Sequence, residues 1–244
     1  GSEMCIRDRL KEIKKTGKPM IVVLIAGKPL AMPWVKENAD AVLVQWYAGE
    51  QQGCTLADIL LGKVNPSGKL NVSFPRSTGN TPCFYNHFVT DREEPFDQPG
   101  TPEEPKGHYI FDKPEPLWNF GHGKSYTTFD YVDCALSDTL LVASDTLKVS
   151  VTIKNTGRRD GKEVVQLYVR DKVSTVATPI QQLKAFQKVL VKPGESQCVE
   201  LSLPIAELAL YNAKMEEVVE PGDFEIQIGA ASDDIRFKKT ITIN

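Results

Sequence analysis

The sequence of 244 residues lacks an excess of either charge, a long apolar run and a regular pattern of cysteines. Its 29 basic and 32 acidic residues leave a formal net charge of -3. A nucleic-acid partner is not expected, because a protein that neutralises phosphates needs a basic face. The longest apolar run, Met20 to Ala26, is far shorter than the ~20 residues of a membrane helix, so we expect no membrane partner.

The five cysteines are far apart and form no CxxC pair or cysteine–histidine cluster. This spacing argues against a disulfide scaffold and a structural zinc site; it leaves one bridge open and favours buried free thiols. GxGxxG, P-loop, HExxH, GxSxG and EF-hand motifs are missing as well. The three histidines, His87, His108 and His122, have no nucleophile or metal-ligand spacing beside them, so we interpret them as loop histidines. The sequence therefore predicts no metal site and no cofactor.

The first nine residues are predicted to be a tag or foreign segment. Gly1-Ser2 is typical of a cloning scar, and residues 3–9 fit poorly with the pattern of residues 10–75. This segment also has no apolar core of the kind that a signal peptide carries. We leave it out of the fold prediction.

Residues 10–75 have an α/β pattern. Apolar, β-branched runs at residues 20–26 and 41–46 predict strands that are buried on both faces, and residues 70–74 a weaker third strand. The segments between them predict helices, which include Pro33 to Asn38 and Gln52 to Leu61. Alternating strands and helices favour a mostly parallel sheet. A sheet covered on both faces usually has five or six strands, so two interpretations remain: a small three-layer domain, or a sequence that starts inside a larger domain. We favour the second.

Two further regions complete the predicted architecture. Residues 76–130 hold most of the prolines and many aromatics, which indicates an ordered connector packed over a neighbour. Residues 131–244 show period-2 alternation, as at Leu147, Val149 and Val151, and predict about seven short strands. The expected fold class is α/β plus all-β: a truncated α/β sandwich followed by a fibronectin-III-like (Ig-like) β-sandwich.

One loop is a candidate for substrate contact. Trp46 and Glu50 follow the second predicted strand, where ligands gather at the carboxyl ends of α/β sheets. An aromatic ring there is suited to stacking on a sugar, and Glu50 to accepting hydrogen bonds from hydroxyls. The alternative, a packed tryptophan and a carboxylate that caps the next helix, remains open. Trp118 of the connector is a third candidate.

Five sequence stretches follow one another in a fixed order and together span nearly all of residues 10–244. They are Gly17-Lys18-Pro19 with residues 22–30, residues 46–62, Asn65-Pro66-Ser67-Gly68-Lys69-Leu70 with Phe74-Pro75, residues 120–129, and residues 155–157, 161, 163–168 and 183–186 of the sandwich. Each stretch is a modest match alone, but in this order they resemble glycoside hydrolase family 3. Ala48, Cys54 and Lys124 depart from the family pattern, with little expected consequence.

The resemblance implies a retaining β-glycosidase, most often a β-glucosidase or β-xylosidase, that acts on a β-linked oligosaccharide or glycoside with two carboxylates. It places the nucleophile on an N-terminal TIM-like barrel and the acid/base upstream of Gly17. No position here matches either motif, so we assign no catalytic residue, and the resemblance implies a missing barrel domain as partner. It also implies a periplasmic or secreted parent enzyme, and an apolar patch on the barrel side of the α/β half. A non-catalytic accessory module that binds polysaccharide or protein is the alternative.

Overall fold

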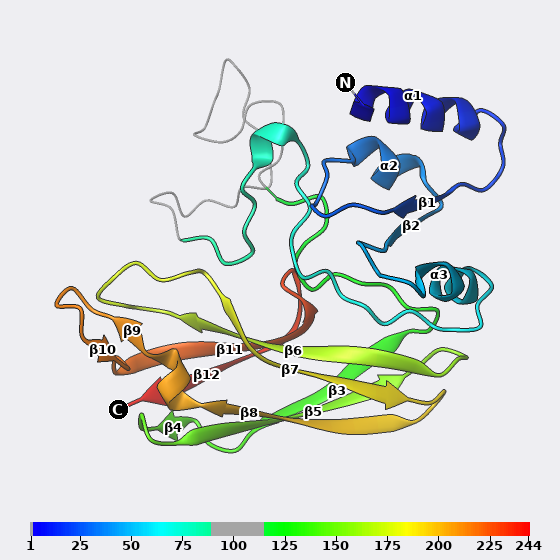
Figure 1. The fold of residues 1–244 in the computed structure, drawn as a ribbon. Helices are drawn as coiled ribbons and strands as arrows, with labels where there is room; N and C mark the ends of the chain where they lie inside the picture. The colour runs from blue at the N-terminus through cyan, green and yellow to red at the C-terminus, as the bar shows by residue number, and fades with distance from the viewer. Residues whose placement is uncertain (1, 89–114) are drawn as a thin grey trace, which may run out of the picture. The chain divides into compact units, whose positions relative to one another are not determined.

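The computed structural model describes residues 2–88 and 115–244, and these form two compact units (Figure 1). The first unit holds residues 2–64, 73–83 and 115–118. The second holds residues 65–72, 84–88 and 119–244. The domain limits expected at residues 9, 75 and 130 stay a prediction, because the units interleave segments of the chain.

The first unit contains a β-α-β crossover. β1 (Ile21–Leu24) and β2 (Ala41–Val44) pair in parallel, with Ile21 opposite Ala41, which confirms the parallel pair. In the view of Figure 1, two helices lie on one side of this pair and the third lies on the other. The helices are α1 (Ser2–Lys14), α2 (Pro33–Asn38) and α3 (Gln52–Leu60). α1 includes most of residues 1–9, and whether those residues are foreign stays a prediction.

Two details of the predicted α/β region, residues 10–75, differ from the prediction. Residues 70–74 form no strand, and Phe74 makes only an isolated antiparallel bridge with Trp118. Pro75, which has no N–H to donate, follows directly, so the pairing does not extend. The strand pair is also not buried on both faces: Ile21 is 51% exposed, and its neighbours in β1 are half-buried. Among the described residues, no further strand covers the outer edge of β1 or β2.

The second unit is a sandwich of two sheets, as predicted. One sheet has the order β4-β12-β11-β6-β7, and the other has the order β3-β5-β8. Their pairs are antiparallel, except that β4 runs parallel to β12. The strands are β3 (Phe129–Leu136), β4 (Leu140–Leu141), β5 (Thr146–Asn155), β6 (Gly161–Asp171), β7 (Gln182–Val191), β8 (Ser196–Pro204), β11 (Gly222–Ala231) and β12 (Asp234–Ile243). The short elements are a hairpin of β9 (Leu210–Tyr211) and β10 (Glu217–Val218), and the 3-10 turns η1 (Thr78–Asn80), which lies in the first unit, and η2 (Ile205–Leu208).

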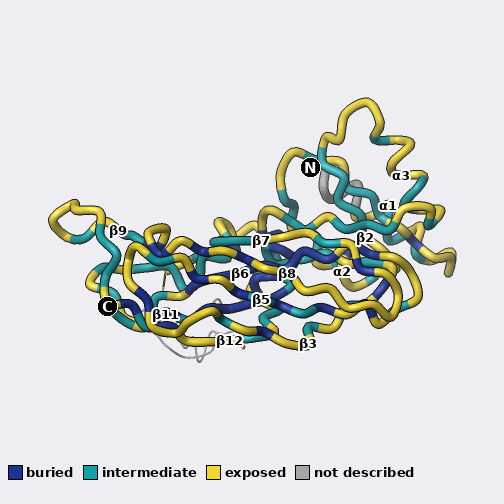
Figure 2. Tube along the Cα trace, turned by 90° about the horizontal axis from the view of Figure 1, so that it is seen from below, coloured by how far each residue is buried: buried dark blue, intermediate teal, exposed yellow. Residues whose placement is uncertain are grey.

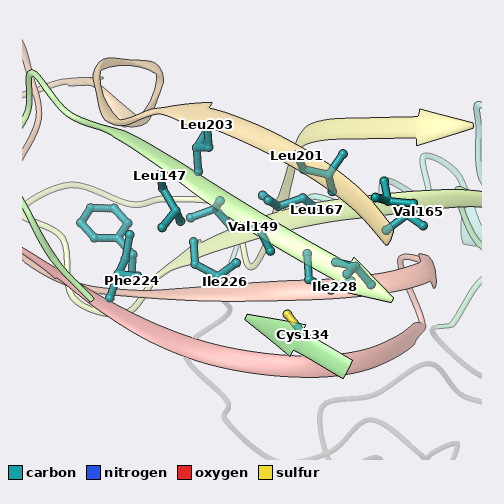
Figure 3. Close-up of a cluster of buried hydrophobic side chains, with 14 of the residues drawn as sticks. Cys134, Leu147, Val149, Val165, Leu167, Leu201, Leu203, Phe224, Ile226 and Ile228 are labelled. Carbon is teal, nitrogen blue, oxygen red and sulfur yellow. The ribbon is translucent and has the colours of Figure 1, made fainter. Parts of the chain in front are cut away.

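The core of the sandwich follows the period-2 pattern of the sequence. Leu147, Val149, Val151 and Ile153 of β5 are fully buried, and the residues between them face outward. Figure 3 shows side chains from β5, β8, β6 and β11 meeting between the two sheets. Figure 2 shows the same division along the chain, with buried segments inside and exposed turns at the rim. The alternation confirms the predicted sandwich.

The strand β6 is the exception to this alternation, because it is buried on both faces. Tyr168 and Gln166 point away from the core, yet they are 0% and 3% exposed. Connector residues cover them: Tyr85 stacks on Phe120 with ring centroids 4.1 Å apart, and Tyr85 meets Tyr168 edge to face at 5.9 Å. The described part of the connector in this unit therefore packs on the outer face of the sheet.

Candidate functional site

The loops after β1 and β2 lie beside each other in the first unit. The backbone pairing continues past the strands, since Gln45 N donates to Leu24 O at 2.9 Å. Trp46 follows with φ of +53°, a left-handed conformation that is strained for a bulky residue. Strain of this kind gathers at functional sites, and carboxyl ends of parallel strands are where α/β sheets bind ligands.

Tyr47 and Glu50 form the exposed part of this loop. The Tyr47 ring is 75% exposed and lies over Gly27, where an added Cβ would come within 2.9 Å of Tyr47 Cε2. Glu50 is exposed, and no hydrogen bond joins its carboxylate to a described residue. The helix α3 begins after Gln51, without a side-chain cap. The capping role considered for Glu50 is therefore not seen.

The two candidate tryptophans meet at one buried ring. Phe74 is 0% exposed, with the Trp46 ring 5.9 Å away and the Trp118 ring 5.7 Å away and nearly perpendicular. Lys36 of α2 lies 5.8 Å from the Trp118 ring and donates to the Leu117 carbonyl. Both tryptophans are half-buried, so part of each ring packs against the protein and part is exposed. Contact of Trp46, Glu50 and Trp118 with substrate stays a prediction.

Asp40 joins the start of both strands to the first helix. Its Oδ2 accepts hydrogen bonds from Met20 N at 2.7 Å and from Lys14 Nζ at 3.1 Å. The Met20 bond, together with Lys14, lowers the pKa of Asp40 below its ordinary value. This carboxylate therefore positions the strand pair that carries the candidate loop.

In the second unit, a network of hydrogen bonds joins three stretches that resemble the family pattern. They are the turn at Asn65, residues 125–127 and the region of Asn155. Asn65 Oδ1 accepts bonds from Ser125 Oγ and Tyr126 N, and its amide donates to Asp160 O. Thr127 Oγ1 donates to Asn155 Oδ1 at 2.6 Å. The amide of Asn155 donates to the carbonyls of Arg159 and Val191. These polar residues connect the turn after α3, the connector and the sandwich strands.

A buried ion pair completes this joint. Lys69 Nζ lies 3.1 Å from Glu163 Oε1, and the two side chains are 15% and 8% exposed. Tyr131 donates its hydroxyl at 3.3 Å to the same oxygen and to Gly229 O. Burial, then the Glu163 charge, raises the pKa of Tyr131, so its hydroxyl stays protonated.

The described histidines and cysteines form no larger cluster. Over residues 2–88 and 115–244, no three His, Cys, Asp or Glu side chains gather as a metal site would require. His87 Nδ1 lies 3.0 Å from Phe88 O, while His108 is outside the described residues. The four cysteines whose side chains are described are free, and only one of them, Cys134, is buried. They are Cys54, Cys83, Cys134 and Cys198. No described helix is long and apolar enough to cross a membrane.

Sequence reasoning missed the residues that organise the candidate loop. Phe74 was expected in a strand and instead is the centre of the tryptophan cluster. No local pattern in the sequence marked Lys36 as a neighbour of Trp118, because the two residues are 82 positions apart. Gly27 was visible only as part of the family-like stretch, although a glycine after a strand is where a ring can approach the backbone closely.

An α/β unit and a fibronectin-III-like sandwich, with these stretches in this order, define the C-terminal region of a class of glycosidases. The sequence model described as glycosyl hydrolase family 3 C-terminal domain matches residues 5–126, and the fibronectin type III-like domain model matches residues 163–232. The chain belongs to glycosyl hydrolase family 3.

Relatives and solved structures agree with this assignment. The chain is 41% identical over 229 residues to a periplasmic beta-glucosidase of Salmonella typhimurium, covering 93% of this chain and 29% of that protein. It is 41% identical over 232 residues to a beta-xylosidase of Formosa agariphila, covering 94% and 31%. The crystal structure of a beta-glucosidase from Listeria innocua in complex with glucose superposes with a TM-score of 0.85 at 37% identity, covering 96% and 32%. The chain thus spans about a third or less of the length of these relatives.

Proposed function

We propose that this chain is the C-terminal part of a retaining β-glycosidase of the β-glucosidase or β-xylosidase class. In this proposal the nucleophile and the acid/base lie outside residues 1–244, and the chain supplies one wall of the active site and a stabilising sandwich. The substrate is a β-linked oligosaccharide or glycoside, and a TIM-like barrel is the partner domain. The parent enzyme is periplasmic or secreted in this proposal, and the name of the Salmonella relative, a periplasmic beta-glucosidase, supports this.

The exposed strand pair carries this proposal. A parallel sheet normally has both faces covered, and two strands alone are marginal in water. Here Ile21 of β1 and Ile25 after it are each 51% exposed, and Leu61 after α3 is 70% exposed. Apolar surface on so small a sheet is what a unit made to pack against more polypeptide would present.

Within this proposal, Trp46, Glu50 and Trp118 are the substrate-proximal candidates. The strained backbone of Trp46 at the carboxyl end of β2 supports its place among these candidates. The exposed carboxylate of Glu50 supports the same role for Glu50. Their role is to position substrate beside carboxylates supplied from elsewhere.

The test joins the chain to its native upstream sequence and assays aryl β-glucosides and β-xylosides. The joined protein should hydrolyse one of them, and the chain alone should hydrolyse neither and should bind a hydrophobic dye. Glu50→Gln in the joined protein should raise KM, whereas Glu37→Gln on α2 is the matched control and should not. Turnover by the chain alone, abolished by a substitution within it, would contradict the proposal.

A non-catalytic accessory module is the second candidate. The second unit has a cavity lined by Lys69, Glu163 and residues 123–125, which favours this candidate because binding there needs no catalytic carboxylate. An unrelated domain or a stop codon upstream of residue 10 in the gene would support this candidate over the first.

A further inference from the structure

A cavity of about 240 Å³ opens beside the buried ion pair of the second unit. Its walls come from the turn at residues 66–69, from residues 123–125 and from the strands β3, β6 and β12. Gly123 allows the two loops to cross closely, since a Cβ there would collide with the carbonyl of Gly68. All of these residues belong to one compact unit.

Glu163 presents an unpartnered oxygen to this cavity. Its side chain is 8% exposed, and Lys69 and Tyr131 both bond to Oε1. No hydrogen bond from a described residue reaches Oε2, and Oε2 is not among the fully enclosed atoms that lack a partner. This oxygen therefore faces the cavity that Glu163 lines. A carboxylate oxygen so nearly buried needs a hydrogen-bond donor.

The remaining walls combine cationic donors with aromatic rings. Lys124 and Lys162 line the cavity from exposed positions and form no ion pair with a described residue. Arg236 pairs with Asp234 and lies 5.7 Å from the centre of the Tyr131 ring. Phe129 and Tyr131 supply apolar surface. A ligand here meets carboxylate and hydroxyl acceptors, several cationic donors and ring carbons.

We propose that this cavity binds a single neutral sugar ring. The hydroxyls of a sugar donate to Glu163 Oε2 and accept from Lys124 and Lys162, and its C–H groups lie against Phe129. A small anion such as sulfate has acceptors only and would leave Oε2 without a donor, and the negative charge of Glu163 repels any anion, phosphate included. The volume lies below the usual range of pockets for drug-sized ligands, which fits one ring rather than an oligosaccharide. The site does not depend on the proposed hydrolytic activity.

The experiment is an amide-shift titration of the isotope-labelled chain with glucose and with xylose as probes. The amides of Gly68, Gly123, Ser125 and Lys162 should shift together and saturate, with a dissociation constant of roughly 1–10 mM for so small a ligand. Glu163→Gln should weaken binding by about tenfold and Lys162→Ala by about threefold. Lys154→Ala, an exposed lysine of β5 outside the cavity, is the matched control and should leave binding unchanged.

Several results would overturn the proposal. One is the absence of saturable shifts at these amides with both sugars at about tenfold above the expected constant. Another is saturable binding of inorganic phosphate that is tighter than that of either sugar. A third is sugar binding that Tyr47→Ala abolishes and Lys162→Ala leaves intact. If Glu163→Gln does not fold, the proposal is tested by the amide shifts of the wild-type chain and by the affinity of Lys162→Ala for the two sugars. No hydrolysis is measured, so failure here is distinct from failure of the proposed activity.

Discussion

The two units differ in how completely each buries its apolar side chains. Among the described residues, the first unit buries four apolar side chains, and the second buries the other 23. The four are Met20, Val35, Phe74 and Leu117. Single exposed apolar residues are normal on any protein, so the informative difference is how few of the described apolar side chains in the first unit are buried. Burial of apolar surface is the main driving force of folding, and the sandwich obtains far more of it.

This contrast separates two kinds of residue that the family-like stretches contain. In the sandwich unit, Asn65 and Asn155 form internal hydrogen bonds through both their amide oxygen and their amide nitrogen, and Glu163 forms internal bonds through Oε1. In the first unit, Tyr47 and Glu50 of the loop after β2 face solvent. In the loop after β2, both side chains are therefore open to contacts outside the chain, whereas in the sandwich unit only part of this polar set is.

The largest expected difference between the units is in amide hydrogen exchange. Amides of β6 and β11 should exchange only through global unfolding, whereas those of β1 and β2 should exchange through local opening at lower free energy. We expect protection at least about 100-fold weaker in β1 and β2, measured by exchange and mass spectrometry at one pH. Equal protection in all four strands would refute the contrast.

A core truncation should follow the same division. Leu167 of β6 is 0% exposed, and Leu61 after α3 is 70% exposed. Leu167→Ala should lower the free energy of unfolding of the sandwich by about 3 kcal/mol, because it removes buried methyl groups and leaves a cavity. Leu61→Ala, the same change at an exposed position, should cost less than about 0.5 kcal/mol. Denaturant unfolding of both variants measures this. A similar loss of unfolding free energy in the two variants would contradict the difference in burial between Leu167 and Leu61.

Within the sandwich, the sequence could predict burial that follows from local alternation, but not burial by a distant segment. In β5, the alternation of Leu147, Val149 and Val151 reflects one wet face and one core face, so strand and core follow from the pattern. In β6, the pattern predicted one wet face, yet Tyr168 is buried there by Tyr85, 83 residues earlier. Local periodicity carries no information about a segment that returns from so far away.

For the candidate loop, the sequence predicted where the loop lies in the fold, but not how its side chains pack. The carboxyl end of β2 was expected to carry Trp46, and the structure adds its left-handed backbone. The meeting of Trp46 and Trp118 at Phe74 was not predictable, because it depends on a bridge between residues 44 positions apart. The apolar runs at β1 and β2 predicted full burial, which would need neighbouring polypeptide that the described residues do not supply.

A smaller effect is expected from the ion pair of the sandwich unit. Lys69→Ala leaves Glu163 buried without its cation, which should cost about 2 kcal/mol of unfolding free energy. The matched control is Lys148→Ala, whose pair with Glu200 spans 3.7 Å between side chains that are 59% and 57% exposed. That exposed pair should contribute about 0.5 kcal/mol or less. Thermal unfolding of the two variants measures the difference, and an equal loss would remove the distinction between buried and exposed pairs.

The smallest predicted effect lies in the first unit and depends on pH. The pKa of Asp40 is lowered in the folded protein by Met20 N and Lys14, so folding favours its carboxylate. Its contribution is therefore complete above the unfolded value, near 3.8, and is lost as the pH falls through the lower folded value. Amide protection of β1 should fall as the pH is lowered from about 4 through the folded pKa of Asp40, and Asp40→Asn should remove part of that fall. Asp58→Asn, which deletes an exposed carboxylate of α3 paired with Lys63 at 3.4 Å, is the control. An unchanged pH profile in Asp40→Asn would mean that this carboxylate does not hold the strand pair.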